Sequence, residues 1–142
     1  MPTYDPIVFG GLEIRFCLDE ADTNRQVTMF EVSVKAGVKV PAPHYHKDFD
    51  ECVYSLEGVV SFHVDGKEHD LKPGESCFIP RGAVHGFANK TEGTMRFLSV
   101  ITPGILGSPY FRELASEIKP GAPPDLTKVK EIMFKYGLVP TP

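Results

Sequence analysis

The first two-thirds of the chain alternate apolar and polar positions with a period of two, which predicts β-strands. In residues 26–34 (QVTMFEVSV), the alternation places Phe30, Val32 and Val34 on one face together with Thr28. Similar segments occupy residues 11–18, 51–71 and 94–102. Because turn residues recur about every eight to twelve positions between such segments, the pattern predicts an all-β sandwich or barrel.

Two dipeptides in this region specify particular turns. Asp65-Gly66 suits a type I′ hairpin, because both central residues of that turn have positive φ. Pro73-Gly74 suits the central positions of a type II turn, where proline fixes the first φ and glycine accepts the second. We therefore expect tight connections at both places.

The pattern changes to a helical period after Pro103-Gly104. Residues 108–118 should form a helix with Ser108 as N-cap and Pro109 at the first helical position. A second predicted helix covers residues 125–137, with Asp125 as N-cap and Gly137 just past its end. The apolar faces of these helices could cover an open part of the β-structure, form a lid over a pocket, or contact a second copy of the chain.

With 142 residues, the chain is expected to form one domain. Within it we expect an N-terminal strand region (1–25), a β-core (26–102) and the two C-terminal helices (108–137).

Composition excludes several classes of function. The net charge is −4 and no Lys/Arg run exceeds two positions, so we expect no nucleic-acid partner. No basic amphipathic helix, membrane-length apolar run or signal-peptide pattern is present, so we expect no membrane association. Three cysteines without a CxxC spacing favour a reducing cytoplasm over a disulfide framework.

The segment PHYHKDFDE (43–51) combines two histidines and a carboxylate at short spacing. On a strand, His44 and His46 would point to the same side with Cα atoms roughly 6.6 Å apart. If residues 47–50 form a hairpin loop, Glu51 would lie nearly opposite His46, with Cβ atoms about 5 Å apart. The spacing therefore predicts three metal ligands from one hairpin.

A fourth ligand is predicted in the segment GESCFIPRGAVHGFAN (74–89). His85 is the candidate, because the intervening strands could return this segment beside the first one. His63 and His69 fit less well, since they flank the Asp65-Gly66 turn among charged residues and are expected to be solvated.

The two segments together resemble the paired motifs of the cupin superfamily. The first motif, G-x5-H-x-H-x3,4-E-x6-G, is matched at Gly37, His44, His46, Glu51 and Gly58. The second, G-x5-P-x-G-x2-H-x3-N, is matched without a gap at Gly74, Pro80, Gly82, His85 and Asn89. The chain departs from the first motif by one residue, since six rather than five separate Gly37 from His44. The resemblance spans about residues 26–102 and is to single-domain, quercetin-dioxygenase-like members.

This resemblance implies a jelly-roll β-barrel with one metal ion held inside near one mouth. It implies His44, His46, Glu51 and His85 as ligands, with Glu51 as a possible catalytic base if it leaves the metal. Such a ligand set suits Fe, Mn, Ni, Co, Cu or Zn, and the sequence does not choose among these metals. Asn89 is too far along its strand to reach the same ion, so we expect it to hydrogen-bond local backbone.

The interior around the metal is expected to be apolar. Phe87 shares the parity of His85, and Phe30 (or Met29) and Phe97 (or Leu98) are candidates on neighbouring strands. An apolar pocket with one metal suits a small, partly aromatic substrate with oxygen donors.

Several functions remain open at this level. The favoured one is a metal-dependent dioxygenase acting on a phenolic or diketone-like substrate. The alternatives are a cupin isomerase or lyase, and a non-catalytic cupin that binds or senses a metal or small molecule. The resemblance further implies a homodimer, because small cupins often dimerise.

Overall fold

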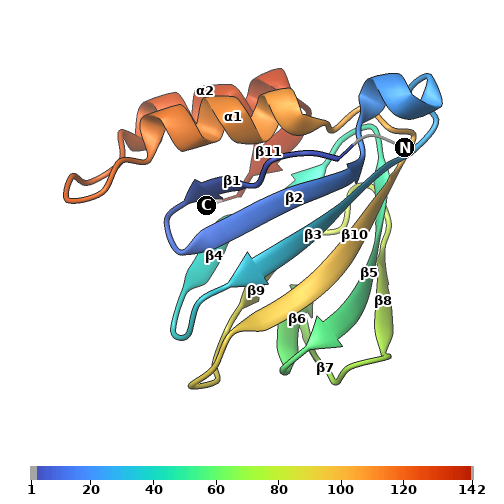
Figure 1. Ribbon diagram of the computed structural model, residues 1–142, viewed down its shortest axis with the longest axis vertical. Helices are drawn as coiled ribbons and strands as arrows, with labels where there is room; N and C mark the ends of the chain where they lie inside the picture. Colours follow the sequence, from blue (N-terminus) through green and yellow to red (C-terminus); the bar gives the residue numbers. More distant parts are fainter. Residues whose placement is uncertain (1–2, 142) are drawn as a thin grey trace.

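The protein consists of two antiparallel β-sheets and two C-terminal helices (Figure 1). This computed structural model describes residues 3–141, apart from the side chains of residues 39–42. The six-stranded sheet has the order β1 (Ile7–Phe9), β2 (Leu12–Leu18), β3 (Thr28–Val34), β10 (Met95–Thr102), β5 (Asp50–Glu57) and β8 (Ser76–Ile79). The five-stranded sheet has the order β11 (Leu138–Pro140), β4 (Lys39–His46), β9 (His85–Ala88), β6 (Val60–Val64) and β7 (Lys67–Leu71).

The helices lie side by side over one end of the sheets, next to β1 and β11 (Figure 1). They are α1 (Ser108–Glu117) and α2 (Leu126–Lys135), and a short 3₁₀ helix spans Glu20–Thr23. Neither α1 nor α2, the α-helices of the described part of the chain, has the length and apolar character needed to span a membrane. The mostly-β architecture with two helices agrees with the predicted jelly-roll class.

Strand β3 shows why the period of two specified a half-buried sheet. Thr28, Phe30, Val32 and Val34 are buried, while the residues between them are partly exposed, as the sequence predicted. The neighbouring strand β10 also has an inward face, which carries Phe97. The Phe97 ring packs against Phe62 of the other sheet, with ring centroids 5.2 Å apart. Burying one such aromatic side chain contributes roughly 1.5–3 kcal/mol, so these inward rows hold the two sheets together.

Both predicted tight turns are confirmed. Asp65 and Gly66 have φ values of 49° and 79° and connect β6 to β7. Gly74 has a φ of 91°, and the Glu75 N–H donates to the Lys72 carbonyl over 2.9 Å, as in a type II turn.

The predicted cap of α2 is confirmed, but that of α1 is wrong. Asp125 accepts hydrogen bonds from two backbone N–H groups of the first turn of α2. Ser108 is the first residue of α1 rather than its cap, and Gly107 takes the cap position. The Asp19 carboxylate accepts from both the Ser108 N–H and its hydroxyl, so a residue distant in sequence supplies the missing acceptor.

The predicted hairpin over residues 47–50 is also wrong. Strand β4 pairs with β9 and β11, whereas β5 pairs with β10 and β8, so the connection crosses from one sheet to the other. Phe49 in this connection is completely buried and stacks on the His46 ring instead of lying in a solvated loop. Glu51 therefore faces the histidines from the opposite sheet.

Candidate metal centre

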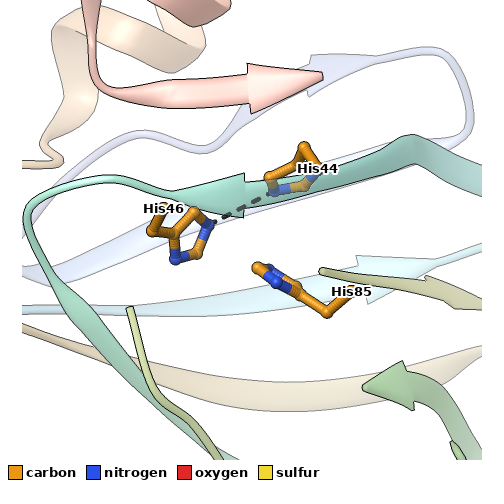
Figure 2. A group of neighbouring side chains, drawn as sticks. All are labelled: His44, His46 and His85. Atoms are coloured by element: carbon orange, nitrogen blue, oxygen red, sulfur yellow. Dashed lines mark hydrogen bonds between the residues drawn. The ribbon is translucent and has the colours of Figure 1, made fainter. Parts of the chain in front are cut away.

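Three histidines meet inside the protein between the sheets (Figure 2). Each of His44, His46 and His85 offers a ring nitrogen, and these atoms lie within 4.8 Å of one another. The Nε2 atoms of His44 and His46 are 3.3 Å apart, and all three side chains are at most 3% exposed. The structure thus brings together the three histidines that the sequence selected.

Strand pairing explains this convergence. His44 and His46 share one side of β4 because they are two residues apart. His85 is the cross-strand partner of His44 in the pairing of β4 with β9. The Gly82 N–H donates to the His46 carbonyl over 2.9 Å, which ties the turn before β9 to the end of β4.

The hydrogen bonds of the rings leave nitrogen lone pairs for a cation. The Nδ1 atom of His85 lies 2.9 Å from the Ala83 carbonyl, which can only accept, so Nδ1 carries the proton and Nε2 is free to ligate. Nδ1 of His46 is buried and has no hydrogen-bond partner. Buried polar atoms are normally satisfied, and a group of neutral imidazoles is a good donor set for a divalent transition metal. The residues present therefore fit such an ion.

Glu51 stands beside the histidine group rather than within it. Its Oε1 atom lies 3.9 Å from Nδ1 of His46 and 3.9 Å from Nε2 of His85. Its Oε2 atom accepts a hydrogen bond from the Ser99 hydroxyl, which fixes the carboxyl group in place. Its service as a fourth ligand, and as a catalytic base, stays a prediction.

Burial controls the charges of these groups. Loss of hydration, with smaller contributions from His85 and His44, lowers the pKa of His46 to about 2, so its ring is neutral at physiological pH. Burial raises the pKa of Glu51, against the opposing influences of His85 and Ser99. Neutral imidazoles can donate to a metal, and a bound cation would favour the ionised carboxylate.

The histidines and Glu51 open into a cavity of about 390 Å³. This volume lies within the roughly 300–1,000 Å³ typical of small-molecule sites. Among the described residues, and apart from the four candidate ligands, the lining has two residues with polar side-chain groups, Ser99 and Tyr110; the others are aliphatic, aromatic, proline or methionine. Phe30, Phe87 and Phe97, the predicted pocket residues, all line it.

The two helices form one wall of this cavity. The helical segment supplies the following lining residues: Tyr110, Phe111, Leu114, Ile118, Pro124, Leu126, Val129 and Met133. This position agrees both with covering an open part of the β-structure and with closing a pocket.

The sequence reasoning missed three residues around the site. Ser99 and Phe49 contact candidate ligands, and Tyr110 lines the cavity from α1. The alternation of β10 could have indicated Ser99, because it shares the parity of the inward Phe97. No local pattern distinguishes Phe49 or Tyr110 from ordinary core residues.

The remaining predictions for polar residues have clear outcomes. His63 and His69 lie on the β6–β7 hairpin, outside the histidine group, and His63 is exposed and paired with Glu68. Asn89 donates to the Val34 and Gly93 carbonyls, over 3.0 and 2.7 Å, which confirms its predicted bonds to backbone. Cys77, within the second motif, is a partly buried free thiol.

The sequence and site together place the chain in a known class. The cupin domain family matches residues 30–101, half of the chain, and both motifs lie within that span. The chain belongs to the cupin family.

Individual relatives differ in their recorded roles. Quercetin 2,3-dioxygenase of Bacillus subtilis is 35% identical over 110 residues, which cover 78% of this chain but 32% of that enzyme. This chain thus spans about a third of the length of that relative. The oxalate-binding protein of Thermotoga maritima is 36% identical over 93 residues, 65% of this chain and 76% of the relative. Among solved structures, the polyketide cyclase RemF of Streptomyces resistomycificus has a TM-score of 0.61 and 30% identity, covering 71% of this chain and 74% of that protein.

Proposed function

We propose that the protein is a metal-dependent cupin enzyme, specifically a dioxygenase that acts on a small phenolic or diketone-like substrate. The observation that carries this proposal is the position of three buried, converging imidazoles beside Glu51 in an otherwise apolar cavity. The likeness to a quercetin 2,3-dioxygenase supports the reaction class.

In this proposal His44, His46 and His85 bind one divalent metal, and Glu51 is the fourth ligand. A metal in this position would supply Lewis acidity or redox chemistry, with coordination positions left for oxygen donors. Once it has left the metal, Glu51 is also the group that would accept a proton from the substrate, with Ser99 keeping its carboxyl group oriented.

The cavity walls would hold the apolar part of the substrate and keep water away from the metal. Aromatic side chains such as Phe30, Phe87 and Phe97 would pack against a flat apolar body and exclude water from the metal. Exclusion of water strengthens the interaction of the substrate oxygens with the charged centre.

A non-catalytic binding role is the second candidate, and one relative favours it. The Thermotoga protein is named as oxalate-binding. No lysine or arginine lines the cavity in the described part of the chain, so a dicarboxylate would depend on the metal alone for charge pairing. This makes an apolar, neutral substrate the better fit. An isomerase or lyase reaction would use the same metal centre and differs by showing no oxygen uptake.

The test combines elemental analysis with oxygen uptake. Wild-type protein, His46→Ala and the control His63→Ala are purified and assayed for bound metal. Each protein is then loaded in turn with Fe, Mn, Ni, Co, Cu or Zn and assayed with quercetin and acetylacetone. We expect His46→Ala to lose most of its metal, while His63→Ala, altered on the exposed hairpin, behaves as wild type.

The outcomes separate the candidates. Oxygen uptake with at least one metal supports the dioxygenase. Tight binding of a probe without turnover favours the binding protein, and turnover without oxygen uptake favours the isomerase or lyase. Retention of metal by His46→Ala would reject the metal centre itself.

We extend the proposal to a homodimer in the cytoplasm. The three cysteines are free thiols, as expected in a reducing compartment. Tyr54 and Phe78 of neighbouring strands are 45% and 57% exposed on the outer face of the six-stranded sheet, where a second copy would cover them. Sedimentation velocity of the wild type and of Phe78→Lys tests this, and a monomeric wild type would reject the dimer.

A further inference from the structure

One polar side chain in the cavity has no role in the metal centre. Tyr110 lies in the first turns of α1 and lines the same cavity as the three histidines. It is 3% exposed, and its ring packs against Phe111 and Tyr136 with centroids 4.9 and 5.5 Å away. Its hydroxyl is thus placed in an apolar wall of the cavity.

The Tyr110 hydroxyl makes no hydrogen bond to any residue in the described part of the chain. In the described part of the chain, three side-chain polar atoms are both fully enclosed and unpaired: His46 Nδ1, Ser55 Oγ and Glu113 Oε2. The Tyr110 hydroxyl oxygen is not one of them, so it is not fully enclosed. The hydroxyl therefore reaches open space, and the cavity is the space that Tyr110 lines.

A comparison with its neighbour shows that this is unusual. The Tyr136 phenol interacts with the Glu113 carboxylate, which raises the pKa of Tyr136 to about 12, and Tyr136 does not line the cavity. Ser99 is the other polar cavity residue beyond the candidate ligands, and its hydroxyl already donates a hydrogen bond to Glu51. A tyrosine needed only for packing could be a phenylalanine, because both rings fill nearly the same space and an unpaired buried hydroxyl is costly.

We propose that Tyr110 is a specificity-determining residue whose O–H donates a hydrogen bond to a substrate oxygen remote from the metal. This deepens the proposed function and rests on it. The substrate class is an aromatic molecule with two separated sets of oxygens, one for the metal and one for Tyr110, joined by an apolar body. Burial raises the pKa of the Tyr110 phenol, so it retains its proton and acts as a donor at physiological pH.

The binding experiment uses zinc-loaded protein, because zinc has no redox chemistry and the probe is not consumed. The probes are quercetin, which carries several ring hydroxyls, and 3-hydroxyflavone, which keeps the chelating hydroxy-ketone but lacks the others. Dissociation constants are measured by calorimetry for wild type, Tyr110→Phe and the matched control Tyr136→Phe.

We expect Tyr110→Phe to weaken quercetin binding by about 2- to 12-fold, the effect of losing one net hydrogen bond. Binding of 3-hydroxyflavone should be unchanged or slightly tighter, because no hydrogen bond to it is lost. Tyr136→Phe should affect neither probe.

A second measurement tests a purely structural role without any ligand. Thermal unfolding of zinc-loaded Tyr110→Phe should occur at the same or a higher temperature than wild type, since no internal hydrogen bond is removed. Tyr136→Phe should unfold at a slightly lower temperature, because it loses its interaction with the Glu113 carboxylate. A clear drop for Tyr110→Phe would show that its hydroxyl already has a structural partner and would overturn the inference.

The remaining outcomes are also decisive. Equal changes for both probes, or no change for either, would reject Tyr110 as a specificity residue and leave the proposed enzyme standing. If zinc-loaded wild type binds neither probe, the proposed aromatic substrate class and the proposed role of Tyr110 are both rejected. Loss of the metal centre is detected separately by the metal content of His46→Ala.

Discussion

The two ends of the cavity are built by different kinds of interaction. At the histidine end, the candidate ligands lie on paired strands, and backbone hydrogen bonds and register fix their positions. At the helical end, α1 and α2 form the wall through side-chain packing, and Leu126 is 66% exposed. Sheet register leaves little freedom for the ligand positions, whereas helix side chains can change with small effects on the fold. We infer that the histidine end sets the chemistry and the helical end sets which molecule fits.

The largest expected effect is the loss of a ligand at the histidine end. His85→Ala should lower metal affinity by more than the roughly 10- to 100-fold typical of residues that only support a ligand. The matched change at the other end, Leu126→Ala, should leave metal affinity unchanged. Competition titration with a chelator measures both, and equal losses would contradict the division between the two ends.

The next effect is on the stability of the metal-free protein. The pKa of His46 falls from 6.5 unfolded to about 2 folded, so the unfolded chain binds the extra proton below pH 6.5 and the folded protein does not. This group should remove about 2 kcal/mol of stability as pH falls from 7 to 5. The raised pKa of Glu51 acts in the opposite direction, because there the folded protein binds the proton more tightly.

Urea unfolding of apo wild type and apo His46→Gln across this pH range isolates the contribution of His46. The difference in unfolding free energy between the two proteins should vary with pH in the stated direction. A constant difference would mean that His46 is protonated in the folded state.

A smaller effect is expected at Ser99, which supports Glu51 from β10. Ser99→Ala removes the hydroxyl that donates to Oε2 of Glu51. Metal affinity should fall by about tenfold, as for other residues that orient a ligand. Ser55→Ala is the matched control, since Ser55 is equally buried but its hydroxyl has no partner. If both variants bind metal like wild type, Glu51 is not a ligand.

The smallest effects should come from the exposed part of the helical wall. Leu126→Ser should change the free energy of unfolding by no more than about 0.5 kcal/mol, because the side chain is largely exposed. Binding of 3-hydroxyflavone to the zinc-loaded protein should still weaken by a few fold. Calorimetry measures 3-hydroxyflavone binding and urea unfolding measures stability in the same samples. A loss of stability without a loss of binding would contradict the role of Leu126 in selecting the bound molecule.

The sequence by itself identified the features that depend on short spacings. The HxHxxxxE spacing and the second motif selected His44, His46 and His85, and all three converge. The turn at Asp65-Gly66 and the N-cap at Asp125 were predictable because their backbone geometry favours particular residue types locally.

Only the tertiary structure decided how these pieces combine. Strand periodicity says which face of β5 is buried, but it does not say which sheet β5 joins, so Glu51 was placed on the wrong neighbour. The cap of α1 by Asp19 and the free hydroxyl of Tyr110 likewise depend on residues that are distant in sequence. Local patterns encode period and backbone angle, whereas partners across the core are chosen by the packing of the whole chain.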